Sequence, residues 1–245
     1  MSGGQIALVA VIFLVAYLVR SMTGFGSALV SVPLLALFLP LKFVVPLTLL
    51  LDFTASTVMS GLHFERVKWN EIGVLIPFGI LGAVLGTKLL ADMPAPPMLM
   101  ALAGLVFIFG VRSVFDFHGD KPVTRAWAAP AALTGGTIGA LFGAGGPPYV
   151  IYLTHRIRDK NDLRATFSIL FLADGMSRVV LFLIAGLLLN TRVWTAYFVS
   201  LPLMLGALYL GGRIQPGLSP SQMTRLVGIL LLVSSVSLLF KALHA

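Results

Sequence analysis

The sequence contains no cysteine and few charged residues, and each shortage excludes a class of function. Without cysteine the chain can form no disulfide, no thiolate nucleophile and no cysteine-ligated metal site. Its four histidines lie in loops or at the ends of apolar segments and show no metal-binding spacing. Gly143 and Gly145 belong to no strand–helix unit, so they form no nucleotide-binding fingerprint. No nucleophile–base pair stands out within a span. We therefore predict a protein that uses no cofactor and is not an enzyme.

The shortage of charge also decides the class of protein. Only 11% of the 245 residues are charged, against about 25% in an ordinary soluble domain. Apolar residues reach 58%, and the mean hydropathy is +0.99. This composition predicts an integral membrane protein with roughly eight to ten spans of about 20 residues and no separate soluble domain. A net charge of +8 would suggest nucleic acid for a soluble protein, but here it indicates basic cytoplasmic loops. The predicted partner is therefore the lipid bilayer, and no nucleic acid is expected. The N-terminus is interpreted as a retained segment rather than a signal peptide.

Two short stretches interrupt the apolar segments. They are residues 20–26 (RSMTGFG) and residues 142–148 (FGAGGPP). Glycine and proline are the poorest helix formers. A backbone exposed to lipid cannot leave the helical conformation, because its N–H and C=O groups would lose their partners. Both breaks are therefore predicted to face protein or a water-filled cavity.

The two halves repeat one order of small residues, prolines and charges. The matching pairs are Gly24 with Gly143 and Gly26 with Gly145 at an offset of 119, Asp52 with Asp174 at 122, and Pro77, Gly86 and Lys88 with Pro202, Gly211 and Arg213 at 125. Internal repeats are a common building plan of secondary transporters. We predict a first transmembrane repeat at residues 1–120 and a second at residues 121–245, within a single membrane domain.

The positions of Lys and Arg predict the topology. If each break is a single span, the two sides of the membrane carry equal numbers of basic residues. If each break turns the chain back, ten basic residues lie on one side and four on the other, as the positive-inside rule expects. We therefore predict an all-α polytopic fold of two inverted repeats, each with a broken or re-entrant first segment and three further transmembrane helices. Both termini would lie outside the cytoplasm of a bacterial cell whose inner membrane holds the protein.

Four charged residues lie in or beside the apolar spans: Arg20, Asp52, Asp174 and Arg178. A charge at the bilayer centre costs at least ~2.5–3.5 kcal/mol, which makes each of them a functional candidate. Structural explanations stay open beside this one. Asp174 and Arg178 are one helical turn apart and can neutralise each other, and Arg20 can snorkel from the boundary or pair with Asp52.

The glycines of the breaks favour an anion site. A helix that begins inside the membrane presents free N–H groups and the positive end of its dipole, and glycine allows a ligand close to the backbone. The segments at 27–39 and 149–154 begin in this way. The alternative is that the glycines only allow close helix packing, which accounts well for Gly82, Gly86 and Gly104. The predicted substrate-binding residues are Arg20, Gly24, Gly26, Ser27, Gly143, Gly145, Gly146 and Arg178, with Asp52 and Asp174 as coupling or gating groups.

These residues resemble the sulfite exporter TauE/SafE family. The resemblance rests on Gly24-Phe-Gly26 with Pro33, on Asp52, and on Gly139 and the Gly143–Pro147 cluster with Asp174, and it covers nearly the whole chain. It implies transport of a small sulfur anion such as sulfite, a sulfonate or sulfoacetate. Ser27 and Ala28 follow the first glycines where Gly146 and Pro147 follow the second, so the two half-sites are not equivalent.

We therefore predict a secondary transporter that binds a small sulfur anion near the membrane midplane, between the two glycine-rich breaks. No ATP-binding motif is present, so a proton or other ion gradient, or the gradient of the substrate, would drive transport. One alternative is a cation or metal-ion permease that uses Asp52 and Asp174. The other is a membrane enzyme or a structural subunit. The transport direction, the coupling ion and homo-oligomer formation stay open at this stage.

Overall fold

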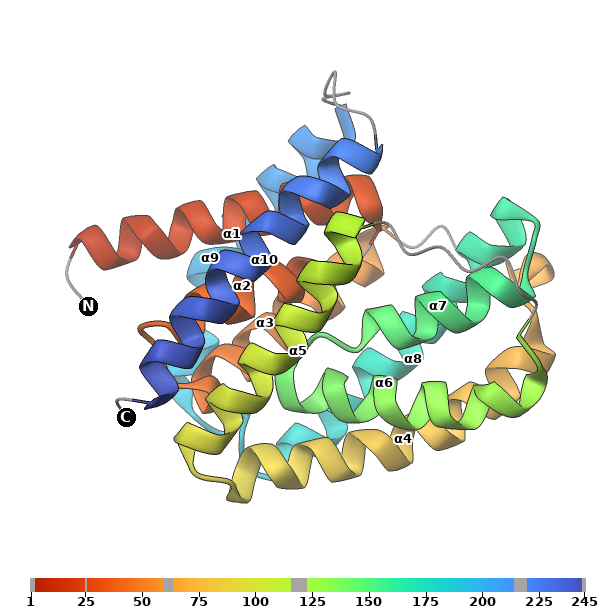
Figure 1. The fold of residues 1–245 in the computed structure, drawn as a ribbon, viewed down its shortest axis with the longest axis horizontal. Helices are drawn as coiled ribbons and strands as arrows, with labels where there is room; N and C mark the ends of the chain where they lie inside the picture. The colour runs from red at the N-terminus through yellow and green to blue at the C-terminus, as the bar shows by residue number, and fades with distance from the viewer. Residues whose placement is uncertain (1–2, 25, 60–63, 116–122, 214–219, 244–245) are drawn as a thin grey trace. The chain divides into compact units, whose positions relative to one another are not determined.

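The computed structural model describes residues 3–24, 26–59, 64–115, 123–213 and 220–243, and every regular element within these ranges is helical (Figure 1). The first half contains α1 (Gly3–Thr23), α2 (Ser27–Ala36), α3 (Leu41–Met59), α4 (Trp69–Asp92) and α5 (Ala95–Phe115). The second contains α6 (Ala128–Phe142), α7 (Gly146–Arg156), α8 (Lys160–Ile184), α9 (Thr191–Arg213) and α10 (Pro220–Leu243). Two short 3-10 turns, η1 (Phe64–Arg66) and η2 (Arg125–Trp127), precede α4 and α6. The predicted all-α fold is confirmed.

Six of the described helices are long and apolar enough to cross a membrane: α1, α3, α4, α5, α8 and α9. This number is lower than the eight to ten spans expected from chain length. The difference arises partly because the breaks produce short helices, with 10 residues in α2, 15 in α6 and 11 in α7. Asp52 and Asp174 lie on two of the long apolar helices, α3 and α8. Both carboxylates therefore belong to candidate membrane spans.

Both predicted breaks are present. Each first arm ends at a glycine with a positive φ, Gly24 at 81° and Gly143 at 71°, a conformation that L side chains rarely adopt. Each second arm begins three residues later, at Ser27 and at Gly146. The latter start lies ahead of the predicted segment 149–154, because two prolines in the first turn have no N–H that the helix would use.

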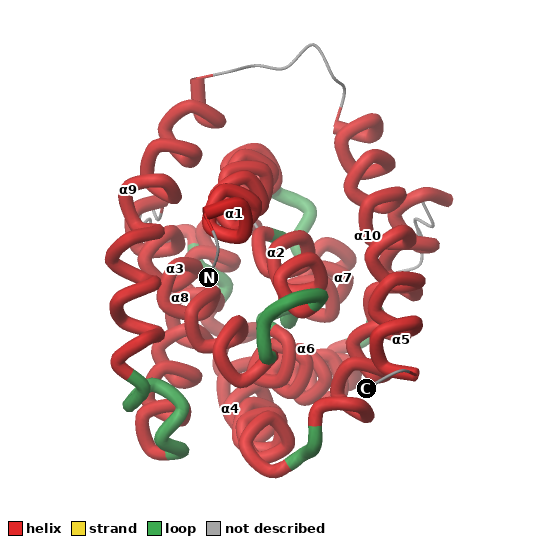
Figure 2. The backbone as a smooth tube through the Cα atoms, turned by 90° about the vertical axis from the view of Figure 1, so that its left-hand side faces the viewer, coloured by secondary structure: helices red, strands yellow, loops and turns green. Residues whose placement is uncertain are grey.

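The chain forms two compact units, and each takes helices from both halves of the sequence. Unit 1 comprises residues 1–48, 92–118 and 192–245, and unit 2 comprises residues 49–91 and 119–191. In unit 1, α5 and α10 run side by side (Figures 1 and 2), and α2 packs against α1, α5 and α10. All residues of α2 except Leu34 are buried. Lys241 Nζ on α10 donates to the Ala36 carbonyl at 2.8 Å and so satisfies one of the open carbonyls at the end of α2.

In unit 2, α7 folds back along α6 as a helical hairpin (Figure 1). Gly145 lies against Gly139, and the Tyr149 ring, one turn further along α7, lies against Gly135, one turn earlier in α6. This reversed order shows that the chain turns back at the second break. Whether this turn makes the two halves inverted repeats stays a prediction.

Glycines on α4 and on α6 allow these two helices to approach each other closely. A Cβ atom on Gly82 would collide with the Leu133 carbonyl, and one on Gly136 would collide with the Gly79 carbonyl. The packing interpretation of Gly82 therefore holds, as it does for Gly86, whose Cβ would meet the Thr137 carbonyl. It is wrong for Gly104, because an added Cβ there has no atom within 4 Å.

Asp159 caps α8 and moves its start five residues ahead of the predicted segment 165–189. Its carboxylate accepts the amide N–H groups of Asn161 and Asp162, both at 2.9 Å. These two bonds hold the pKa of Asp159 below its usual value, and the bond from Asp162 has the larger effect. At the other end α8 stops at Ile184, ahead of Gly186 with a φ of 76°.

Replacing Asp159 with alanine is expected to lower the thermal unfolding temperature at pH 7, whereas asparagine, which also accepts capping bonds, retains most of the stability. The part of the stabilisation that depends on the negative charge of Asp159 is the difference in unfolding temperature between wild type and Asp159→Asn. Because folding lowers this pKa, that difference is present at neutral pH and disappears as the pH falls through the lowered pKa. Thermal unfolding in detergent at several pH values measures it. Equal unfolding temperatures for wild type and Asp159→Ala at pH 7 would contradict the capping role.

Candidate functional site

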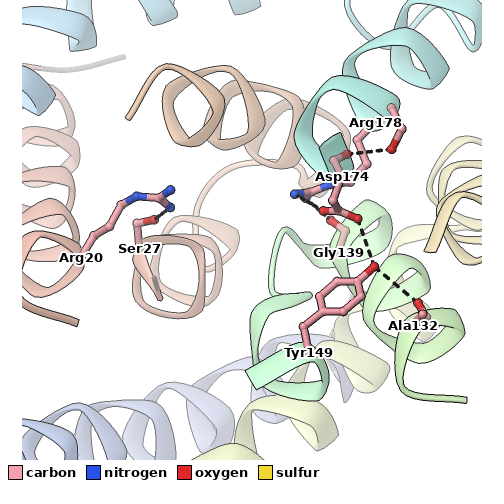
Figure 3. A network of polar contacts seen from close by, with 8 residues as sticks. Arg20, Ser27, Ala132, Gly139, Tyr149, Asp174 and Arg178 are labelled. Atoms are coloured by element: carbon pink, nitrogen blue, oxygen red, sulfur yellow. Dashed lines mark hydrogen bonds and ion pairs between the residues drawn. The ribbon is translucent and has the colours of Figure 1, made fainter. Parts of the chain in front are cut away.

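The first break places a buried cation at the positive end of a helix. The Arg20 side chain comes from the last turn of α1, is 7% exposed, and donates from Nη1 to Ser27 Oγ at 2.9 Å (Figure 3). Ser27 is the first residue of α2. The first hydrogen bond of that helix runs from the Val30 N–H to the Gly26 carbonyl, so the preceding amides of its first turn have no partner within the helix. A guanidinium and a helix N-terminus both attract negative charge.

The glycines of the first break leave open space beside the backbone. Gly24 and Gly26 have φ angles of 81° and 95°, and an added Cβ on either would have no atom within 4 Å. Their role is therefore conformational: they let the chain turn without a strained side chain. The open space leaves this stretch of backbone accessible to a small group.

The second break is packed more tightly. The Gly143 N–H closes α6 on the Gly139 carbonyl at 2.8 Å. A Cβ on Gly145 would collide with the Gly135 carbonyl and lie 2.9 Å from Gly139 Cα, so the packing role considered above applies to this glycine. Two prolines follow Gly146 and supply no N–H to the first turn of α7. This break therefore offers fewer backbone donors than the first.

Asp174 and Arg178 form an ion pair beside the second break (Figure 3). Arg178 Nη2 lies 2.7 Å from Asp174 Oδ2, and the two side chains are 11% and 5% exposed. Arg178 Nη1 also donates to the Gly139 carbonyl at 2.9 Å. The pairing that the one-turn spacing allows is therefore present, and the structure adds a bond from the pair to the end of α6.

Tyr149 completes this network and was not among the predicted site residues. Its hydroxyl lies 3.2 Å from Asp174 Oδ1 and 3.5 Å from the Ala132 carbonyl, and its side chain is 1% exposed (Figure 3). A buried tyrosine hydroxyl needs a hydrogen-bond partner. That rule, applied to a tyrosine directly after the Gly-Pro-Pro sequence, could have suggested a partner among the intramembrane carboxylates.

The structure also brings the α3 segment that carries Asp52 to the α8 segment that carries Asp174. A Cβ on Gly175 would lie 2.9 Å from Phe53 Cδ2, so the residues that follow the two aspartates are in contact. The residue one turn after Asp52 is Ser56, whereas Arg178 occupies that place after Asp174. The arginine that stands one turn after Asp174 on α8 therefore has no counterpart one turn after Asp52 on α3.

A second polar cluster joins the start of α4 to the end of α7. Arg156 Nη2 lies 2.8 Å from Glu71 Oε1, and the Tyr152 hydroxyl donates to Glu71 Oε2. Lys68 Nζ forms a further ion pair with Asp162 at 2.7 Å. The four charged residues of this cluster, without Tyr152, line a cleft of about 570 Å³ that is open to solvent. Glu71 is buried and needs such partners to keep its charge, and this cluster too was absent from the predicted site.

Comparison with known proteins identifies the family. The profile of the sulfite exporter TauE/SafE family matches residues 8–238. The chain belongs to the sulfite exporter TauE/SafE family. TsaS of Comamonas testosteroni, described as a probable inner membrane transporter protein, is 27% identical over 195 residues, which are 78% of this chain and 81% of that protein. No solved structure matches the chain significantly.

Family membership settles the class of activity. TauE/SafE proteins are membrane transporters, which agrees with the six long apolar helices among the described residues. The chain is therefore a multi-pass membrane transporter and not an enzyme. The first break, with Arg20, lies in unit 1, and the second break, with Arg178 and both aspartates, lies in unit 2.

Proposed function

We propose that this TauE/SafE protein is a secondary transporter of a small sulfur-containing anion such as sulfite, sulfoacetate or another organosulfonate. The observation that carries the proposal is the first break, where the buried Arg20 guanidinium lies at the N-terminus of α2. Two positive groups at one buried place favour an anion there. A cation would be repelled by both.

The chemistry of a sulfonate suits this end of α2. Each of its oxygens accepts hydrogen bonds, and the break supplies a guanidinium, the Ser27 hydroxyl and the first-turn amides of α2. Gly24 and Gly26 keep the neighbouring backbone open. In unit 2, Arg178 would provide countercharge beside Gly143, Gly145 and Gly146, with a smaller contribution from backbone amides because two prolines follow.

Helix boundaries support a duplicated architecture. The starts of α2 and α7 are 119 residues apart, as are those of α3 and α8, while α4 and α9 start 122 apart and α5 and α10 125 apart. The same three values occur among the sequence offsets, although the matching residues Asp52 with Asp174 and Pro77 with Pro202 are three residues further apart than the starts of their helices. We propose two inverted repeats, at residues 1–120 and 121–245, in a bacterial inner membrane with both termini outside the cytoplasm, and with Asp52 and Asp174 as coupling or gating groups.

Purified protein is expected to be stabilised by sulfite and methanesulfonate and not by divalent cations, because the candidate site is positively charged. Thermal unfolding in detergent with each anion, at constant ionic strength set with gluconate, measures the effect. Magnesium and manganese are the divalent cations tested. Neither is expected to stabilise the protein, because no group of three or more metal-ligating side chains occurs among the described residues. Stabilisation by a divalent cation alone would favour the permease alternative and overturn the anion site.

A further inference from the structure

We propose that Arg178 changes partners during transport: protonation of Asp174 releases its guanidinium to the transported anion, so that one proton moves with each monovalent sulfonate. The inference rests on the proposed function and adds the coupling ion, the stoichiometry and a positioning residue, Tyr149. All the contacts that it uses lie within unit 2.

Two nitrogens of the Arg178 guanidinium are hydrogen-bonded, and the third has no acceptor in the part of the chain that the structure describes. Nη2 is bonded to Asp174 and Nη1 to the Gly139 carbonyl, whereas Nε is buried and has no acceptor among the described residues. A buried N–H without a partner destabilises the protein, so this donor favours a state in which an acceptor reaches it. A sulfonate oxygen could accept from Nε while a second oxygen replaces the carboxylate at Nη2, which is the side-on geometry that arginine offers to oxyanions.

The charges of Asp174, Arg178 and the sulfonate balance only if Asp174 is protonated when the sulfonate binds to Arg178. The ionised Asp174 and a sulfonate compete for one guanidinium, and both anions cannot be neutralised by it in a region of low dielectric constant. When Asp174 takes a proton on Oδ2, the pair loses its charge attraction and Arg178 is left with a net positive charge. The sulfonate restores neutrality. After the anion leaves, Asp174 releases the proton and pairs with Arg178 again, so a full cycle moves no net charge.

Tyr149 is suited to follow the protonation state of Asp174. Its hydroxyl has one proton but two acceptors within reach, Asp174 Oδ1 at 3.2 Å and the Ala132 carbonyl at 3.5 Å (Figure 3). The ionised carboxylate is the stronger acceptor and takes the bond. After Asp174 is protonated, the hydroxyl can donate to Ala132 instead. Tyr149 therefore positions and stabilises the ionised form.

Few charged or titratable groups among the described residues face Asp174. On α8 it faces Arg178, and from α7 it faces Tyr149. The sequence of α6 contains no titratable residue, and the α4 residues nearest to Asp174, between Leu75 and Ile80, contain none either. On α3, Asp52 precedes Phe53, which packs on Gly175.

A small cavity beside Asp174 has room for one water molecule that could carry the proton. It has a volume of about 10 Å³ and is lined by Tyr149, Asp174 and Ser177 together with apolar residues of α4 and α8. That volume is about the least that holds one water molecule, and the three polar side chains supply the hydrogen bonds such a water needs.

The experiment uses the full chain in proteoliposomes that contain a pH-sensitive dye, with radiolabelled methanesulfonate as the probe because its charge does not change with pH. In wild type, uptake is expected to acidify the lumen with one proton per sulfonate and to be independent of the membrane potential. Asp174→Asn is expected to keep sulfonate exchange between the two sides, while uptake driven by a pH gradient falls at least tenfold. Tyr149→Phe is expected to keep the stoichiometry but move the pH of half-maximal uptake upward by about one unit, because the ionised carboxylate loses a donor.

Tyr209→Phe is the matched control, because its ring is 59% exposed and contacts Arg213 rather than the network. Its pH profile is expected to equal that of wild type. Sulfonate uptake in wild type without proton movement would overturn the inference and leave the proposed function intact, whatever the variants do. Undiminished proton-driven uptake by Asp174→Asn would overturn it as well. Absence of sulfonate exchange in wild type would instead overturn the proposed function, and the inference with it.

Discussion

Replacing Arg20 with alanine is expected to reduce sulfonate transport about 100-fold or more, which is the largest functional effect that the structure predicts. A charge-assisted contact to a bound anion in a buried place contributes on the order of 2–5 kcal/mol, and 2.7 kcal/mol corresponds to a factor of about 100. The Arg20 guanidinium is almost fully buried and is already directed to the first turn of α2 through Ser27. Initial rates of methanesulfonate uptake into proteoliposomes, normalised to reconstituted protein, measure the loss.

Graded variants separate the charge from the geometry. Arg20→Lys keeps the charge but loses the planar donors, so we expect an intermediate loss of about tenfold. Ser27→Ala removes one neutral hydrogen bond and is expected to raise KM by roughly 3–10-fold. Arg213→Ala is the control for loss of one positive charge, because that side chain stacks on the exposed ring of Tyr209. Wild-type uptake by Arg20→Ala would show that the anion site is not at the first break.

Replacing Gly82 with alanine is expected to destabilise the protein by roughly 2–3 kcal/mol, because the added methyl group has no room. Its Cβ would collide with the Leu133 carbonyl and lie 2.9 Å from the Thr137 nitrogen. Both atoms belong to the backbone of α6, which cannot rotate away as a side chain can. Thermal unfolding in detergent is expected to shift down by roughly 5–10 °C.

Gly73→Ala is the matched control, because it lies on the same helix, α4, and an added Cβ there has no atom within 4 Å. Alanine is the better helix former by up to about 1 kcal/mol, so this variant is expected to be as stable as wild type or slightly more stable. If Gly82→Ala and Gly73→Ala unfold at the same temperature, the close approach of α4 and α6 is refuted.

Much of the fold could be predicted from sequence because it follows from composition and local chemistry. Apolar segments of about 20 residues specify membrane helices, and clustered glycine and proline specify where a helix cannot continue. The breaks at Gly24 and Gly143 were therefore predicted correctly, and the pairing of Asp174 with Arg178 was one of the explanations that the sequence left open. Helix ends were predicted less well at α8, because the cap supplied by Asp159 extends the helix beyond the apolar run.

The candidate site was only partly predictable, because its contacts join residues that are far apart in the chain. Tyr149 reaches a carboxylate 25 residues away, and Glu71 pairs with an arginine 85 residues away. The division of the chain into two units is likewise invisible in sequence, since each unit combines segments of both halves. Periodicity shows which residues share a helix face but not which helix will cover it.

The two glycine breaks show most clearly what each level of structure decides. The sequence by itself determined that the protein lies in a membrane, that its helices break twice, and that charged groups accompany the breaks, because these properties depend on residue type and immediate neighbours. Only the tertiary structure decided that Gly24 and Gly26 border open space while Gly145 is packed against α6. The reason is physical: a glycine relaxes the backbone wherever it occurs, but the room that its missing side chain leaves is filled or left open by atoms of other helices.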